Sequence, residues 1–573
     1  MNILRTGSRR AASWRQAGRK GSAERVRGIP LRPGVLALAA IASSVAGHSA
    51  WAFSIDTGNP DVRLRWDNTV KYSAAWRVKK PSGTLTNSPP STVNQDDGDR
   101  NFDRGLISSR LDLFSEMDLV YRGFGARISG AAWYDDVYNR SNDNDSPTTA
   151  NAYSVPYDRF PGEAEKLHGG NSEVLDAFVF GGVDIGESRA TFRLGKHALL
   201  WGESLFFGAN GIAGGQAPVD VVRVLSVPNT TFKELIRPVQ QLSAQLQINA
   251  DVSVGAYYQF RWEKNRFPAA GSYFSTLDIF DDGDERLIMG APLVPGGGPA
   301  AFFEGRDIEA KDWGQGGVQV RFRVGETDYG LYAIRYHDKS PSLYFVPGVG
   351  VNPLTGQIGE YRKVYAEGIR AFGASFSHTF DNFNVAGEIS TRRNTPLASD
   401  PQVDVSGTAD NSHRPLYAVG NSLHAQVSWI GTLGHSFIAD EADFIGEIAW
   451  NRRLGVTKNR SALTPNADED AVNLRLLYEP KYRQALPGVD LSVPIGLGYG
   501  IGNSSVVGAF YGDRVGDVNI GINATYLQAW RFGLSYTHFF GPEGTLINDA
   551  NHASYQQALK DRDFISLSIR RTF

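Results

Sequence analysis

Alternation of apolar and polar residues, in stretches of about ten, is the feature that most constrains how this chain can fold. In the stretch DVNIGINATYL, Ile520 and Ile522 lie on one face. Asn519 and Asn523 lie on the other. A period of two is that of a β-strand, and about ten residues is the length with which a tilted strand crosses a bilayer. The pattern recurs in VQVRFRV, RFGLSYTHF, FGASFSHTF, FNVAGEIS and FIGEIAW.

Connections of two very different lengths separate these stretches. Tight polar turns occur at residues 121–124, 184–187, 249–251, 325–328 and 381–382. Long segments, all polar except residues 196–240, occupy residues 79–104, 139–172, 196–240, 264–315, 339–365, 393–420, 452–470 and 541–562. Soluble β-sandwiches also alternate, but they have no reason to separate short turns from long loops. Outer-membrane barrels do so, because short turns lie at one rim and long loops at the other.

The pattern predicts an all-β fold, a transmembrane antiparallel β-barrel of about 18 strands, with 16 as the alternative. The uncertain joints are residues 431–441 and 479–490, which are long for the short-turn rim. An even strand number places both ends of the mature chain in the periplasm. Beyond residue 52 no run of about 18 apolar residues offers a membrane-spanning helix. A closed barrel is then the structure that satisfies every backbone group in lipid.

The first 52 residues have the make-up of a secretory signal peptide. Nine basic residues and one acid precede the apolar stretch Val35–Ala46, and Ala50-Trp51-Ala52 is a small-x-small cleavage site. We therefore predict a signal peptide at 1–52 and a mature barrel at 53–573. Taking those charges from the 58 basic and 61 acidic residues of the chain leaves a net charge of −11. Such an acidic chain disfavours nucleic acid as a partner.

Three long segments are strongly acidic, namely QDDGDR at 95–100, SNDNDSP at 141–147 and DIFDDGDER at 278–286. The main interpretation is that they are solvated outer loops. The alternative is weak binding of divalent cations near lipopolysaccharide. The acids of the third segment lack the complete spacing of a calcium-binding loop, so we assign no metal ligands.

Residues 196–240 differ from the other long segments because they are apolar and rich in glycine. An apolar loop in water is costly, and long loops in compact domains are usually functional. We expect this segment to fold into the lumen as a constriction or plug, whereas the alternative is a pair of extra strands. Its Leu199, Leu200, Phe206 and Phe207 would suit an apolar solute. The candidate pore-lining residues are Lys196, His197, Glu203, Asp220, Arg223, Lys233, Glu234 and Arg237.

Catalytic motifs are absent from the sequence. There is no HExxH and no phosphate-binding GxxxxGK[ST], and the absence of cysteine excludes disulfides and thiolate metal sites. Gly202–Phe206 lacks the second glycine of a nucleophile elbow. We therefore predict no enzyme, no cofactor and no catalytic residues, with an outer-membrane hydrolase as the remote alternative.

The final stretch, DFISLSIRRTF, reads as the closing strand of the barrel. Ile565, Leu567 and Ile569 share one face, and Ser566 and Ser568 share the other. In a closed barrel this strand must pair with the first strand, within residues 62–78. The terminal aromatic, Phe573, would then lie in the interfacial girdle, and it resembles the signal that the outer-membrane assembly machinery recognises.

Three blocks of sequence resemble an uncharacterised family of Gram-negative outer-membrane proteins, the domain of unknown function numbered thirteen-oh-two. They begin FSIDTGNPDVRLRWDNTV, NFDRGLISSRLDLFSEMD and LGKHALLWGESLFFGANG. The resemblance implies a single outer-membrane barrel that moves hydrophobic compounds alongside a periplasmic or lipoprotein partner. It supplies no functional residues.

The predicted function is passage of small, hydrophobic molecules across the outer membrane through a porin-like channel, among outer-membrane lipids and lipopolysaccharide. Residues 196–240 would gate the channel, and pore width and lining charge would select the solute. The alternative is a closed structural or docking barrel that forms the outer-membrane component of an assembly.

Overall fold

The computed structural model describes residues 53–227, 232–280 and 282–573, without the side chains of residues 53, 54, 233 and 234. The predicted signal peptide, residues 1–52, lies outside this part. No helix within it is both long and apolar enough to cross a membrane.

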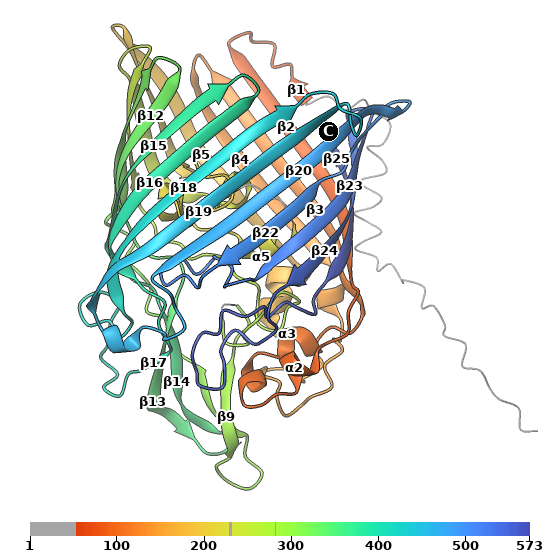
Figure 1. The fold of residues 1–573 in the computed structure, drawn as a ribbon, viewed down its shortest axis with the longest axis vertical. Helices are drawn as coiled ribbons and strands as arrows, with labels where there is room; N and C mark the ends of the chain where they lie inside the picture. The colour runs from red at the N-terminus through yellow and green to blue at the C-terminus, as the bar shows by residue number, and fades with distance from the viewer. Residues whose placement is uncertain (1–52, 228–231, 281) are drawn as a thin grey trace, which may run out of the picture. The chain divides into compact units, whose positions relative to one another are not determined.

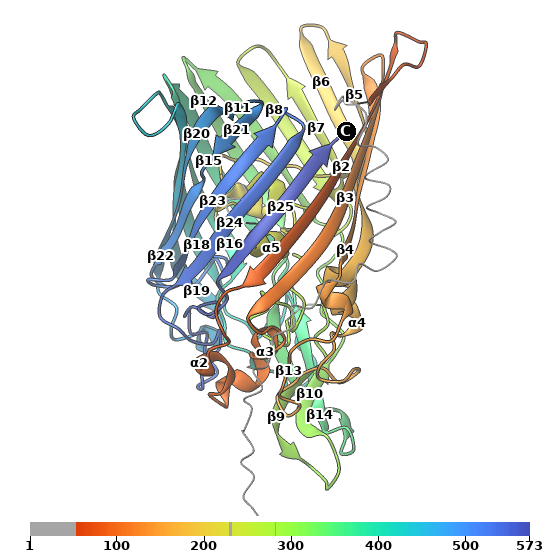
Figure 2. The same cartoon turned by 90° about the vertical axis from the view of Figure 1, so that its right-hand side faces the viewer.

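One sheet of tilted strands runs around the wall and closes on itself (Figures 1 and 2). Every neighbouring pair is antiparallel, and the last strand, β25, pairs with β2. β21 and β22 are two parts of one strand, since both pair with β20 and β23, and β1 pairs with β2 alone. Pro494 lies in the break between those two parts, because proline has no N–H to give to the ladder. The barrel therefore has the predicted 18 strands.

The wall consists of these strands: β1 (Phe53–Ile55), β2 (Val62–Arg77), β3 (Gly105–Tyr121), β4 (Phe124–Asp135), β5 (Gly170–Ile185), β6 (Ser188–His197), β7 (Val239–Gln247), β8 (Val252–Gln259), β11 (Gln315–Val324), β12 (Thr327–Tyr336), β15 (Ile369–Phe380), β16 (Phe383–Pro396), β18 (Val419–Leu433), β19 (Glu441–Lys458), β20 (Asp470–Leu486), β21 (Val489–Ser492), β22 (Ile495–Ile501), β23 (Gly516–Tyr526), β24 (Trp530–Phe540) and β25 (Phe564–Thr572).

The two faces of the wall differ as predicted from the alternation. Ile520 and Ile522 are 48% and 52% exposed, whereas Asn519 is buried and donates to the backbone carbonyl of Tyr536. Large apolar side chains are exposed in this way on strand after strand of the wall. An exposed apolar belt outside and polar side chains inside are the arrangement that lipid imposes on a barrel.

Connection lengths also follow the prediction. All eight predicted long segments join successive wall strands, and the two uncertain joints are the short turns 434–440 and 487–488. A ninth long connection, residues 502–515 between β22 and β23, was not predicted. Its first residue, Gly502, continues the glycine alternation of β22, so alternation alone does not show where that strand ends.

Three of the long connections build a second sheet outside the barrel, which was not predicted from the sequence (green, lower part of Figure 1). Two of its contacts, β10 with β14 and β13 with β17, are parallel pairings between different loops. Non-local pairing of this kind leaves no local signal in the sequence. The sheet has the order β17 (Gln402–Val403), β13 (Ser342–Asn352), β14 (Gln357–Val364), β10 (Pro299–Glu304) and β9 (Arg286–Pro292).

The helices of the described part are short and lie in the connections. They are α2 (Gly83–Thr86), η1 (Ser91–Asn94), α3 (Asp97–Arg100), η2 (Val137–Asn139), α4 (Gly162–Ala164), η3 (Glu165–Gly169), η4 (Ile212–Gly215), α5 (Val221–Ser226), α6 (Phe232–Leu235) and η5 (Arg460–Ala462).

The seam of the barrel lies between β2 and β25, as predicted for the final stretch. Thr69 pairs with Thr572 and Arg77 with Phe564 at the two ends of the contact. Phe573 extends the ladder, since its N–H and its carbonyl both bond to the backbone of Asn68, at 2.9 and 2.8 Å. The backbone of the last residue thus belongs to the closing contact.

Phe573→Ala keeps the backbone N–H and carbonyl that make both hydrogen bonds, and it removes only the aromatic ring. We expect a sharp fall in heat-modifiable protein in the outer membrane, with the precursor degraded in the periplasm. The reason is that the ring is predicted to serve both the interfacial girdle and the assembly machinery. Phe573→Tyr is the matched control and should assemble normally. If Phe573→Ala reaches the wild-type level of heat-modifiable protein, the aromatic ring of Phe573 has no special role in assembly.

Candidate functional site

The connection between β6 and β7, residues 198–238, is attached to the inner face of the barrel, and we call it the inward segment. Glu388 on β16 is 5% exposed and accepts the backbone N–H of Glu203 at 3.0 Å and that of Ile212. A Cβ atom at Gly202 would lie 2.1 Å from the Glu388 Oε2 atom, and Gly202 has a φ of +88°. Glycine is therefore needed where the inward segment meets this carboxylate.

A second carboxylate, Glu447 on β19, holds the next part of the inward segment. It is fully buried and accepts the backbone N–H groups of Phe206 and Phe207 at 2.5 and 2.8 Å. The following residue, Ile448, is 45% exposed on the outer face, so Glu447 points into the barrel. Two wall carboxylates thus satisfy backbone donors of a loop that forms no ladder there.

A cation lies between the wall and the carbonyl groups of the same segment. The Arg392 guanidinium on β16 donates to the carbonyls of Ala209, Asn210 and Gly211, at 2.8 to 2.9 Å. The Asn210 side chain donates to Gln426 on β18 at 3.1 Å. Both donors and acceptors of the inward segment therefore find partners on strands β16 to β19.

Aromatic packing fixes the start of the inward segment against a neighbouring part of the wall. Trp201 packs edge-on against Tyr257 of β8, with ring centroids 4.9 Å apart, and tilted against Tyr332 of β12 at 6.3 Å. Ile212 is buried in the same cluster. These contacts account for the apolar composition that distinguishes this loop from the others.

The other end of the inward segment reaches a different wall. α5 begins after Asp220, whose carboxylate accepts the N–H of Arg223 at 3.1 Å. Leu225 packs against a buried cluster that contains Ile107 of β3 and Phe564 of β25. β25 forms one side of the seam and β3 pairs with β2 on the other side, far around the sheet from β16 and β19. The segment therefore crosses the lumen, as predicted, and does not form a pair of extra strands (Figure 1).

The predicted pore-lining residues do not form one group. Lys196 shares the outer face of β6 with exposed Leu194, and its ammonium group donates to the Val174 carbonyl at 2.8 Å. His197 is buried at the end of that strand, 2.8 Å from the Ser243 hydroxyl. Both precede the inward segment and belong to the wall.

Glu203, Asp220 and Arg237 lie in the inward segment and take part in ion pairs. Glu203 lies 3.4 Å from Arg321 of β11. Asp220 lies 3.1 Å from Arg266, and Arg237 lies 3.1 Å from Glu173 of β5, which itself pairs with Arg266. Lys233 and Glu234 lie in α6, and their side chains fall outside the described part.

The wall residues that hold the segment were not predicted from the sequence; they are Glu388, Arg392, Gln426 and Glu447. A signal for two of them was present, because FNVAGEIS and FIGEIAW each place one glutamate on the polar face of a membrane strand. Ionisable groups at membrane depth are costly and mark functional positions.

Several basic side chains lie close together where α5 approaches the seam. Lys71 on β2 is surrounded by the charges of Asp112, Arg110, Arg223 and Arg570. Asp112 pairs with Arg110 at 2.8 Å. This group of four cations and one carboxylate, which we call the seam cations, joins the wall to Arg223 of the inward segment.

A closed 18-strand antiparallel barrel with an apolar outer belt, a polar inner face and short turns at one rim is an outer-membrane β-barrel. The chain belongs to the family described as Protein of unknown function (DUF1302), which matches residues 34–573. No curated protein matches the chain.

Among solved structures, the chain is similar to OccAB2 of Acinetobacter baumannii, with 9% identity, 89% of this chain and 98% of that chain covered, and a TM-score of 0.40. It is similar to Pseudomonas aeruginosa OpdK, solved with vanillate, with 10% identity, 89% and 98% covered, and a TM-score of 0.39. It is also similar to the trimer form of Vibrio cholerae OmpT, with 11% identity, 89% and 99% covered, and a TM-score of 0.36. The barrel assignment rests on the strand pairing of this chain itself.

Proposed function

We propose that this barrel is a channel for small solutes across the outer membrane, narrowed by the inward segment. The observation that carries the proposal is the attachment of that segment to opposite parts of the wall. Its first half bonds to Glu388, Arg392 and Glu447, and its helix α5 packs near the seam. A segment held on both sides sets a fixed pore width, which selects solutes by size.

We infer that the preferred solute is small and amphipathic, with an anionic group and an apolar body. The seam cations would attract the anionic group, because a low-dielectric wall strengthens their field. Much of the apolar surface of the inward segment is used in packing, as where Phe207 contacts Phe510 with ring centroids 5.5 Å apart. Leu200 and Phe206 are only partly buried and supply the apolar contact predicted from the sequence.

Planar-bilayer recording of the purified barrel tests the channel against the docking barrel. Steady openings of uniform size support the channel. A folded, heat-modifiable barrel that stays silent, and that co-purifies with a periplasmic or lipoprotein partner, would instead support the docking barrel.

The seam cations predict anion preference. Arg223→Gln removes one positive charge from the inward segment while keeping a side chain of similar length. We expect the ratio of anion to cation permeability, measured from reversal potentials in a salt gradient, to fall about twofold or more, because nearby fixed charge sets local ion concentration. Arg460→Gln, in η5 of an outer loop, is the matched control. An equal change in both variants would contradict a role for the seam cations.

A further inference from the structure

Three carboxyl groups from two outer connections meet in the interior of the loop region. Asp96 and Asp97 come from the connection between β2 and β3, and Asp278 comes from the connection between β8 and β11. One carboxylate oxygen of each lies within 4.8 Å of the others. All three are buried, so the prediction that these acidic segments are solvated is wrong for these residues.

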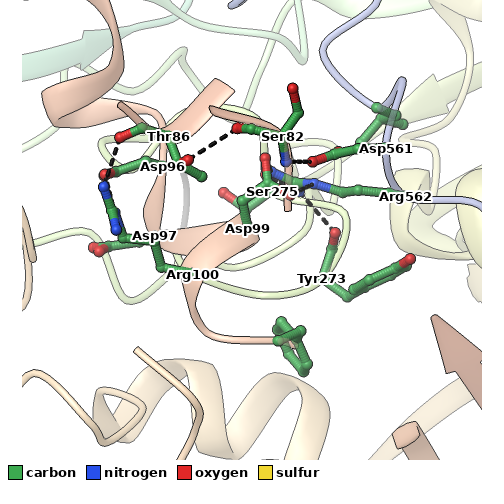
Figure 3. Close-up of polar contacts among 12 residues, drawn as sticks. Ser82, Thr86, Asp96, Asp97, Asp99, Arg100, Tyr273, Ser275, Asp561 and Arg562 are labelled. Atoms are coloured by element: carbon green, nitrogen blue, oxygen red, sulfur yellow. Dashed lines mark hydrogen bonds and ion pairs between the residues drawn. The ribbon is translucent and has the colours of Figure 1, made fainter. Parts of the chain in front are cut away.

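Few cations balance this cluster. Arg100 pairs with Asp96 at 2.5 Å, and the charge of Arg286 acts on Asp97, which leaves three carboxyl groups to two cations. Arg77 and Arg562 lie beside it, but they are engaged by Asp99 and Asp561 in an ion-pair network of their own. Figure 3 shows Arg100 beside Asp96 and Asp97, and Arg562 beside Asp99 and Ser275.

The surplus of negative charge makes ionisation of the cluster costly. Asp96, Asp97 and Asp278 are buried together, so their negative charges repel one another with little water to screen them. A bound cation would remove this cost, because it replaces the water that ionised carboxylates have lost.

An unsatisfied amide oxygen points to a ligand at the same place. Asn151, from the connection between β4 and β5, is 2% exposed, and its Oδ1 atom has no hydrogen-bond partner among the described residues. The Oδ1 atom of Asp278 likewise has none within that part of the chain. Asp97, Asn151 and Asp278 line one small cavity with a volume of about 10 Å³. Buried oxygens of this kind normally have a partner, and the space suits one ion or water.

We propose that Asp96, Asp97, Asp278 and Asn151 form a calcium-binding site that ties three outer connections together. All donors are oxygens, and Ca²⁺ takes six to eight oxygen ligands at about 2.3–2.6 Å, so ligands on opposite sides lie about 5 Å apart. The 4.8 Å spread of the carboxylate oxygens fits that sphere. Zinc prefers nitrogen and sulfur ligands, and Mg²⁺ demands a smaller octahedron.

The calcium site would fix the loops around the outer opening of the barrel. This role does not depend on which solute the channel carries. Its ligands come from residues 78–104, 136–169 and 260–314, and the last of these carries β9 and β10 of the second sheet. Crosslinking the three connections would hold the outer loops in one arrangement. The sequence could not show this, because each acidic segment alone lacks a complete set of ligands.

The test is calorimetric titration of CaCl₂ into the whole folded barrel, in detergent free of lipopolysaccharide and after removal of metal with EGTA. We expect one Ca²⁺ per chain. Asp278→Asn, which keeps the side-chain shape, should weaken binding at least tenfold, and Asn151→Ala should weaken it severalfold. Asp103→Asn, an exposed acid of the same connection as Asp97, is the matched control and should bind as the wild type does.

Two results would overturn the proposal. Folded wild-type protein that takes up no Ca²⁺ would show that the carboxyl groups share protons instead. Equal affinity in wild type, Asp278→Asn and Asn151→Ala would place the bound ion elsewhere. If Asp278→Asn fails to fold, the wild-type titration and Asn151→Ala still decide the matter.

Discussion

Replacing residues 208–218 by a short Gly-Ser linker is expected to raise the single-channel conductance severalfold and to sensitise cells to bulky antibiotics. This stretch contains the carbonyls that Arg392 binds and the N–H of Ile212 that Glu388 binds. Without it the inward segment keeps only the bond from the Glu203 N–H to Glu388 on β16, so it narrows the lumen much less. Planar-bilayer conductance and antibiotic inhibition zones measure the effect.

The matched control is the same replacement of residues 348–356, at the tip of the hairpin between β13 and β14. That hairpin belongs to the second sheet, so its removal should leave conductance unchanged. Both variants must show heat modifiability on gels, which reports a folded barrel. Unchanged conductance of a folded variant lacking residues 208–218 would count against the constriction.

Ile522→Arg is expected to lower the folded fraction of the barrel far more than Asn523→Arg. Ile522 is 52% exposed on the outer face of β23, and an arginine facing lipid near the bilayer midplane costs about 2–4 kcal/mol. Asn523 is the adjacent residue on the inner face, where an arginine meets water. Refolding into lipid vesicles along a urea gradient, read by heat modifiability, measures the difference.

Asn523→Arg is itself the control, because it places the same side chain one residue away on the same strand. A strand register that is wrong by one residue would exchange the two faces. Equal loss of folding in the two variants would therefore contradict the assignment of Ile520 and Ile522 to lipid.

Alternation and turn chemistry predicted the wall because both are local properties. Ile520 and Asn519 differ in environment since successive residues of a strand point to opposite faces. The pairing of Phe564–Thr572 with β2 followed from closure alone, because a barrel in lipid has no free edge. The apolar composition of residues 196–240 also predicted that this loop folds inward, because apolar side chains exposed to water are unfavourable.

The partners of that segment were not predicted, because they lie on strands far along the chain. Glu388 and Glu447 are recognisable as ionisable residues on membrane strands, but the sequence does not show which backbone groups they bind. Their role follows from the tertiary structure, which places the N–H groups of Phe206 and Ile212 beside their carboxylates. Lys196 and His197 adjoin the inward segment in sequence, but the structure places both on the wall.

The sequence by itself determined the class of fold, the faces of the strands and the location of the unusual loop, because each depends on the periodicity or composition of neighbouring residues. Only the tertiary structure decided which wall residues hold the inward segment and how Asp96, Asp97, Asn151 and Asp278 meet. Apart from the neighbours Asp96 and Asp97, these contacts join residues 54 to 241 positions apart. A network of buried charges depends on where the whole chain places each group, and no local pattern encodes that placement.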